Sequence, residues 1–323
     1  MHPAFSVIFL TTLIGVGQGF FLALFTGQSY AAVELLPAQD SERFFALGSV
    51  IALAFLAAGL GASFFHLGRP ARAWRAASQW RTSWLSREVI LLPVVMGLVA
   101  LYGMAHYFGW KADLLGNGMA GQLTLLIGMA ATVAAFLLFL TTAMIYAAVK
   151  FLQEWASPLT VLNYTLLGGA SGFTLATAFS AFQAPALVPF YGGWAMTLTL
   201  AALISRGASL IRNARLRHKS TLQSAIGIRH TQIRQKAMGM MGGAFNTREF
   251  FHGATALFFR AIKWIFLALT FVVPLALLWG GVELADAGLL SAAFLTQYAG
   301  LLFERWFFFA QASHPQNLYY QTV

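Results

Sequence analysis

Residues 66–88 read HLGRPARAWRAASQWRTSWLSRE, and this segment decides how the whole chain is interpreted. It carries five arginines and three tryptophans, has no acidic residue between His66 and Glu88, and is flanked on both sides by long apolar runs. Positive charge of this kind gathers in the cytoplasmic loops of membrane proteins. The segment is therefore predicted to be a cytoplasmic loop between two membrane spans.

The composition of the 323-residue chain excludes an ordinary soluble domain. Hydrophobic residues make up 59% of it and charged residues 9%, which is too little charge to cover a soluble surface. The chain has no cysteine and so offers no thiolate to an iron–sulfur cluster. The net charge of +10 comes from basic loops beside apolar spans, so nucleic acid is not expected as a partner. No metal site is predicted in this chain.

Eight apolar runs are each long enough to cross a hydrocarbon core of ~30 Å at ~1.5 Å per residue. The predicted fold is an all-α polytopic integral membrane protein, with residues 1–323 as one membrane-anchor domain and a long basic loop at about 205–253. The predicted spans are Phe5–Ala32, Phe44–Phe65, Val89–Tyr107, Gln122–Ala148, Leu159–Phe182, Tyr191–Leu210, Leu257–Leu278 and Ala287–Phe309. Pro274 is expected to kink the seventh span, where a neighbouring helix must satisfy the freed carbonyl.

The distribution of basic residues predicts the orientation of the spans. With the N-terminus inside the cell, 18 of the 20 Lys and Arg residues fall on the cytoplasmic side, and only Arg43 and Lys111 fall outside. Such a bias sets membrane topology, whereas acidic residues contribute little. Both termini are therefore predicted to be cytoplasmic. The first apolar run has no basic residue before it, so it is not expected to be a cleaved signal peptide.

The long basic loop has two possible interpretations. Nine Lys and Arg residues lie between Arg206 and Arg248, with Leu210, Leu216 and later apolar residues at roughly helical spacing. An interfacial helix on anionic lipid explains this pattern. A docking surface for a cytoplasmic partner is the alternative.

His66 and Glu88 are the candidate chemical groups. His66 ends the second predicted span and Glu88 opens the third, so a helical hairpin brings both to the cytoplasmic interface. Histidine changes charge near neutral pH, and a partly buried carboxylate can be tuned to do so. Quinone reduction moves two protons with two electrons and needs such groups near the quinone oxygens. The alternative is that both residues only cap helix ends.

Other notable residues have structural interpretations, and two groups of them also have functional alternatives. The tryptophans among the arginines suit an interfacial belt, or else the rim of a quinone pocket and a docking site for an acidic partner. Glu304 and Arg305 are expected to form ion pairs with each other or with other helices, and a role in proton transfer is the alternative. Bonding or close packing between helices is expected for Gln18, Asn163, Tyr164, Gly15–Gly19 and Gly168–Gly172.

The histidines argue against a haem. A b-type haem in a helical bundle needs two axial ligands that face each other inside the membrane. Of the seven histidines, only His66 and His106 lie near span ends, and these ends are predicted on opposite faces of the membrane. No haem is expected in this chain.

Several motifs resemble a known family. The stretch from His66 to Trp74, followed by Ser86-Arg87-Glu88, is similar to the anchor subunit of the dimethyl sulfoxide reductase family, as are the eight spans. Five further segments resemble the branch of that family that anchors sulfite-oxidising molybdenum enzymes. They begin at Pro3 (PAFSVIF), Lys150 (KFLQEW), Asn163 (NYTLLG), Phe245 (FNTREFF) and Glu304 (ERWFFF, through HPQNLYY at His314).

The resemblance implies a three-subunit oxidoreductase in a bacterial inner membrane. A large catalytic subunit holds a molybdenum bis-pterin cofactor, a second subunit holds iron–sulfur clusters, and the anchor exchanges electrons with ubiquinone or menaquinone. In the family, the positions that match His66 and Glu88 belong to the quinone site. Arg69, Arg87 and Tyr320 are predicted to lie near it.

The resemblance and the charge pattern together favour one member of this class. The reductase branch typically docks its catalytic subunits on the periplasmic side, whereas the sulfite-oxidising branch is thought to work in the cytoplasm. The end with His66 and Glu88 is the one predicted to face the cytoplasm. The leading hypothesis is therefore the anchor of a cytoplasmic sulfite:quinone oxidoreductase. The alternatives are the anchor of a dimethyl sulfoxide, polysulfide or tetrathionate reductase, a transporter for a small sulfur anion, and a purely structural anchor.

Overall fold

The computed structural model describes residues 4–110, 112, 122–217, 223–224, 227–232 and 256–312, and the elements within these ranges are all helical. The long helices are α1 (Phe5–Ala32), α2 (Leu47–Phe64), α3 (Trp84–Tyr107), α4 (Gln122–Ala147), α5 (Pro158–Gln183), α6 (Val188–Ala214), α9 (Ala256–Leu267), α10 (Val273–Glu283) and α11 (Ala287–Ala310). The short elements are a π-helix before α2 (Ser41–Ala46), a π-turn joining α9 to α10 (Ala268–Val272) and 3₁₀ segments at Pro70–Gln79 and Pro185–Leu187.

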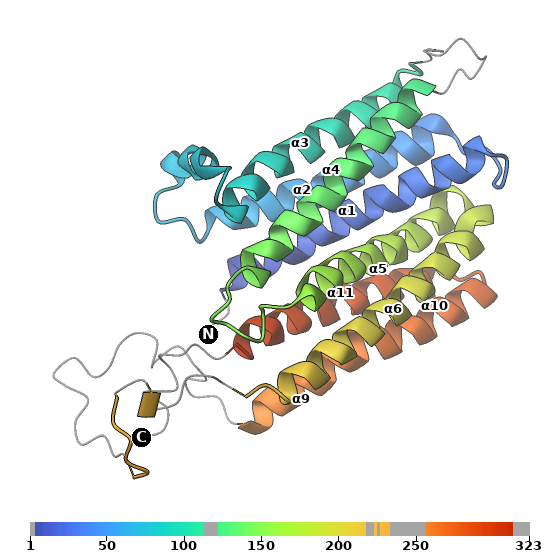
Figure 1. Cartoon of the computed structure of the whole chain (residues 1–323). Coiled ribbons are helices and arrows are strands. Elements are labelled where there is room, and N and C mark those ends of the chain that lie inside the picture. Colours follow the sequence, from blue (N-terminus) through green and yellow to red (C-terminus); the bar gives the residue numbers. More distant parts are fainter. Residues whose placement is uncertain are drawn as a thin grey trace.

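The helices form one elongated bundle. Figure 1 shows α1 to α4 on one side and α5, α6, α9 to α11 on the other, with α1 and α5 side by side between them. Seven helical stretches in the described part of the chain are long and apolar enough to cross a membrane, which makes this a multi-pass membrane protein. Helix α11 is not among the seven because it carries Gln297, Glu304 and Arg305, but its 24 residues also run along the bundle.

Glycines explain how closely α1 and α5 approach each other. A Cβ atom added to Gly19 would lie 2.0 Å from the carbonyl oxygen of Gly168, and one added to Gly172 would lie 2.0 Å from the carbonyl carbon of Gly19. Only glycine fits such a backbone contact, which is a common way to pack helices in membranes. The predicted close packing of these two glycine runs is confirmed.

The π-turn before Pro274 shows how a helix breaker is accommodated. Proline has no N–H to donate to the carbonyl four residues earlier, which here belongs to Thr270. The amide Nε2 of Gln297 on α11 donates to that carbonyl at 3.2 Å. A neighbouring helix therefore satisfies the freed oxygen, as the sequence predicted, and this explains a buried glutamine in α11.

Contacts between distant segments place the basic regions at one end of the bundle. Ile8 at the start of α1 belongs to the same apolar cluster as Trp155 and Phe308, and the indole of Trp155 donates to the carbonyl of Phe308 at 2.9 Å. The start of α1, the α4–α5 connection and the end of α11 thus share one end, hereafter the basic end. The end of α6 joins them, because Arg212 donates to the carbonyl of Gln153 at 3.0 Å.

Helix boundaries largely agree with the predicted spans, but the predicted end of the sixth span, which corresponds to α6, was wrong. The sequence placed the edge of this span at Leu210 and counted Arg206 as the first basic residue of the long loop. The helix instead continues to Ala214 and buries Arg206, which is 1% exposed. Burial is possible because a carboxylate on α11 pairs with this guanidinium. Most of residues 218–253, including the predicted interfacial segment beyond Leu216, lie outside the described residues.

Candidate functional site

The segment from His66 to Glu88 lies at the basic end and is largely exposed. The 3₁₀ stretch Pro70–Gln79 has no buried residue, and Trp74 and Trp80 are 71% and 55% exposed. Arg75 and Arg81 each place a guanidinium over the ring of the preceding tryptophan, 5.5 and 5.4 Å from the ring centroids. The segment therefore presents tryptophan rings and positive charge together on its surface.

Among the predicted site residues that the structure describes, Glu88 is the one that the fold buries. Ser83 caps α3 by accepting a hydrogen bond from the backbone N–H of Ser86, so the helix begins before the predicted Val89 and carries Glu88 inward. Its side chain is 6% exposed, and Oε1 accepts a hydrogen bond of 2.6 Å from the hydroxyl of Thr142 on α4. No described residue forms a salt bridge with Glu88, and a buried carboxylate without such a partner is costly in a membrane and commonly functional.

The other predicted site residues that the structure describes lie at the same end of the bundle but form no bond with Glu88. His66 is exposed after the end of α2, and no hydrogen bond or ion pair links it to Glu88 in the structure as described. Arg69 is also exposed. Arg87 braces the loop: it donates to the carbonyls of Trp80 and Arg81 at 2.9 and 2.8 Å.

Arg87 and Tyr320 complete the set of predicted site residues. The guanidinium of Arg87 also lies 4.2 Å from the ring centroid of Trp84, so its role in the fold is local. Tyr320 lies outside the described residues. A quinone pocket made of these residues therefore stays a prediction.

A small polar cavity lies behind Thr142. It measures about 20 Å³ and is bounded by α1, α4, α5 and α11. Its polar lining is Thr11, Thr12, Gln18, Thr142, Tyr164, Ser171 and Arg305. A space of this size holds a water molecule, since ~10–15 Å³ is enough for one, but not a quinone ring.

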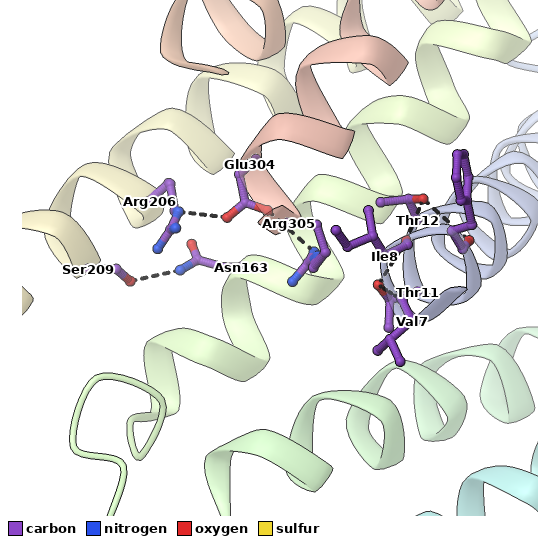
Figure 2. A network of polar contacts seen from close by, with 10 residues as sticks. Val7, Ile8, Thr11, Thr12, Asn163, Arg206, Ser209, Glu304 and Arg305 are labelled. Carbon is purple, nitrogen blue, oxygen red and sulfur yellow. Dashed lines mark hydrogen bonds and ion pairs between the residues drawn. The ribbon is translucent and has the colours of Figure 1, made fainter. Parts of the chain in front are cut away.

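Beyond the cavity, charged side chains cross the bundle between α11 and α6. Figure 2 shows Arg206 facing Glu304, with Nε 2.7 Å from Oε1, and Arg305 on the other side, with Nη2 3.6 Å from Oε2. The Arg305 guanidinium also lies 3.8 Å from the ring centroid of Tyr164. The predicted ion pairing of Glu304 is confirmed, and Arg206 is the partner that the sequence did not reveal.

Asn163 continues this polar region toward the basic end. Its amide Nδ2 donates to the hydroxyl of Ser209 on α6 at 2.7 Å, so the predicted bonding between helices is confirmed for this residue (Figure 2). One helical turn further, Arg212 bonds the α4–α5 connection as described above. A polar track therefore runs along α6 from the buried Arg206 to the basic end of the bundle.

A second cavity, of about 280 Å³, is lined by residues of α1, α4, α5 and α6. Its lining is mainly apolar and includes Phe25, Phe136, Phe173 and Trp194, and it contains neither His66 nor Glu88. Such a lining suits a hydrocarbon chain better than a polar ring.

The two histidines near span ends lie far apart. His106, at the far end of α3, is buried between Phe45 and Tyr102, with ring centroids 4.6 and 4.5 Å away. His66 lies at the basic end, so the two are on opposite ends as predicted. Within the described ranges, no three His, Asp or Glu side chains are grouped so that they could hold a metal ion.

Comparison with known proteins identifies the family. Residues 1–320 match the family described as DMSO reductase anchor subunit (DmsC). The chain belongs to this family. A similar protein is the C subunit of sulfite dehydrogenase from Allochromatium vinosum, which is 59% identical over 325 residues covering 100% of both chains. The resemblance seen in the sequence is thus confirmed, and the protein is a membrane anchor subunit of the DMSO reductase family.

In the anchor subunit, sequence reasoning found the buried carboxylate but not what surrounds it. Thr142 and Tyr146 are ordinary helix residues in the sequence, and only the pairing of α3 with α4 shows that Thr142 faces Glu88. The single available signal was their position one turn apart near the basic end of the fourth span.

Proposed function

We propose that this anchor subunit serves a cytoplasmic sulfite:quinone oxidoreductase and provides the site where quinone takes up electrons and protons. The observation that carries the proposal is the 59% identity over full length with a protein named as the C subunit of a sulfite dehydrogenase. Sulfite is oxidised on a molybdenum-containing partner, and electrons reach this chain through the iron–sulfur clusters of a second partner. The chain itself has no cysteine to hold such a cluster.

The distribution of charges supports the orientation. The basic end carries the arginines of residues 69–87 together with Lys150 and Arg212, whereas Glu34, Glu283 and Asp286 lie at the opposite end with Arg43. By the positive-inside rule, the basic end faces the cytoplasm of a bacterial inner membrane. Helix α11 is the eighth crossing, which brings both termini to the cytoplasmic side. Its buried charges are tolerated because they pair inside the bundle.

The chemistry of the site supports the placement of the quinone. Reduction to quinol adds one proton to each of the two ring oxygens, so the site needs two groups that deliver protons. Glu88 supplies one of them, held by Thr142, and His66 supplies the other. The cavity behind Thr142 is too small for the ring, so the ring binds on the side of Glu88 that faces the His66 loop. Arg69 and Arg87 lie around it, and Tyr320, which is outside the described residues, is proposed as a further neighbour.

The exposed basic segment supports the placement of the partner. Trp74 and Trp80, each with an arginine over its ring, form a surface to which an acidic face of the iron–sulfur subunit binds. Tryptophan and arginine are the residues most often responsible for binding energy at interfaces. Docking here brings a cluster close to the proposed quinone.

The test compares two electron acceptors in the purified complex. Glu88→Gln and His66→Ala are expected to lower sulfite-dependent quinone reduction by about a hundredfold or more, while reduction of a soluble artificial acceptor by the partner subunits is unchanged. Glu283→Gln, an exposed carboxylate at the other end of the bundle, is the matched control and should retain both activities. Wild-type quinone reduction in both site variants would contradict a quinone site at these residues and would favour a purely structural anchor.

A second candidate is the anchor of a reductase, in which the same groups take protons from quinol. The family description, DMSO reductase anchor subunit, favours it. Reduction of a sulfoxide or polysulfide by quinol, in a complex that does not oxidise sulfite, would select this alternative.

A further inference from the structure

Three residues that line the same small cavity each carry a buried polar atom with no hydrogen bond to another described residue. The atoms are Oε1 of Gln18 on α1, the hydroxyl of Tyr164 on α5 and Nε of Arg305 on α11. Buried polar atoms nearly always have a partner, either protein or ordered water. The cavity of about 20 Å³ has room for water, and a buried water typically makes about three hydrogen bonds. The atoms and the space therefore match a bound water.

The cavity also adjoins the proposed quinone site. Thr142 lines it and donates to Oε1 of Glu88, so a single side chain separates the cavity from the carboxylate. Tyr146, one turn further along α4, stacks on Tyr164 with ring centroids 5.7 Å apart. The cavity thus lies between the carboxylate on α3 and the charges on α11.

On its other side, the cavity leads to the buried ion pairs and then to the basic end. Arg305 contacts Glu304, which pairs with Arg206, and these three side chains are at most 5% exposed. Along α6, Ser209 and then Arg212 follow Arg206 at intervals of three residues. Arg212 is only partly buried and bonds the carbonyls of Gln153 and Ala156. Ionisable residues inside membrane bundles commonly line proton pathways.

We propose that this cavity holds ordered water that resupplies Glu88 with protons from the cytoplasmic surface, by way of the Arg206–Glu304–Arg305 cluster and Tyr164. This rests on the proposed function and extends it. Glu88 is 6% exposed, so a quinone ring bound over it blocks direct exchange with bulk water. The proton that Glu88 gives to a ring oxygen is replaced by one from the cavity water. Glu304, ionised between its two arginines at rest, takes up a proton from the cytoplasmic surface and passes it to that water. The arginines stay protonated and orient the water, and the two electrons come from the iron–sulfur partner.

The alternative is that the polar cluster only packs the helices together. Two uncharged substitutions separate the two explanations: Gln18→Leu, which replaces the amide beside the cavity with an apolar side chain, and Tyr164→Phe, which removes one hydroxyl. Both are positioning changes that leave the ion pairs intact. Thr26→Val on α1, whose hydroxyl bonds the carbonyl of Leu22, is the matched control.

The experiment measures sulfite-dependent quinone reduction by the whole complex in water and in deuterium oxide. Each variant is expected to lower kcat about tenfold and to raise the solvent isotope effect, with KM for quinone within about twofold of wild type. Each variant should keep the wild-type turnover with the artificial acceptor. The control variant Thr26→Val should keep the wild-type kcat and isotope effect with quinone. Wild-type kcat and isotope effect in both variants would overturn the proposal.

The outcome is distinguishable from failure of the proposed function. If Glu88→Gln also keeps full quinone reduction, the quinone site itself is elsewhere. If Glu88→Gln lowers quinone reduction but both cavity variants keep the wild-type kcat and isotope effect, only the proposed proton path is wrong. Should either cavity variant fail to assemble, an experimental structure of the wild-type complex decides. Water bonded to Gln18, Tyr164 and Arg305 is expected there, and a dry cavity would overturn the proposal.

Discussion

Breaking the ion pairs between α6 and α11 should reveal an asymmetry in stability. Arg206 and Glu304 are each 1% exposed and their charged atoms are 2.7 Å apart, whereas Arg305 contacts the same carboxylate at 3.6 Å. Charge centres about 4 Å apart interact by about 4 kcal/mol at an effective dielectric constant of about 20, and breaking a buried pair typically costs about 3–5 kcal/mol. The losses in the free energy of unfolding caused by Arg206→Met and by Glu304→Gln should therefore lie at different points of this range.

Arg206→Met removes one of two cations and leaves Glu304 paired with Arg305, so the charges still balance. It should lower the free energy of unfolding by about 3 kcal/mol. Glu304→Gln leaves two buried arginines with no carboxylate between them and should cost about 5 kcal/mol. The double substitution should cost about 2 kcal/mol less than the sum, because each single change already breaks the shared pair.

The assay is reversible unfolding in mixed micelles with increasing sodium dodecyl sulfate, followed by tryptophan fluorescence. Arg212→Met, a partly buried arginine on the same helix, is the control and should cost less than either single change. A larger loss for Arg206→Met than for Glu304→Gln, or additive losses in the double variant, would refute the reasoning from charge balance.

Three other predictions follow from the packing, the topology and the site. Gly172→Ala should lower the free energy of unfolding by about 1–3 kcal/mol, because the added Cβ meets the α1 backbone. The control is Gly193→Ala, which has no atom within 4 Å of the new Cβ and should not destabilise the protein. Equal losses in the two variants would contradict the tight crossing of α1 and α5. Because the chain has no cysteine, the single variants Ser78→Cys and Ala38→Cys each report the side of the membrane on which their residue lies. A membrane-impermeant maleimide should label Cys at position 78 only from the cytoplasm and Cys at position 38 only from outside. The reverse pattern would overturn the orientation. Thr142→Val removes the hydrogen bond to the carboxylate on α3 and should lower quinone reduction about tenfold with unchanged artificial-acceptor turnover; Thr197→Val, an exposed threonine on α6, is its control.

Local patterns predicted the helices well. Hydropathy and length fixed α1 and α4 to within one residue at each end, because each long apolar run forms one membrane-length helix. The glycine runs predicted a close crossing because only small residues allow it, and Pro274 predicted a freed carbonyl because proline lacks an N–H. These features depend on residues that are near each other in sequence.

Features that depend on contacts between distant helices could not be predicted. Arg206 looks like a loop arginine until Glu304, 98 residues later, is seen beside it. Thr142 gains its meaning only from the register between α3 and α4, which places its hydroxyl 2.6 Å from Glu88. His66 and Glu88 were correctly expected at the same end, but the fold exposes one and buries the other, because Glu88 lies inside α3 while His66 follows the end of α2.

Photolabelling of the purified complex with an azidoquinone, followed by mass spectrometry of the labelled peptides, tests the central claim most directly. The label is expected to attach to residues 66–88 or to the end of α4 around Thr142, and excess unlabelled quinone is expected to prevent it. Specific labelling confined to the opposite end of the bundle, around the α1–α2 or α10–α11 connection, would contradict a quinone site at the basic end.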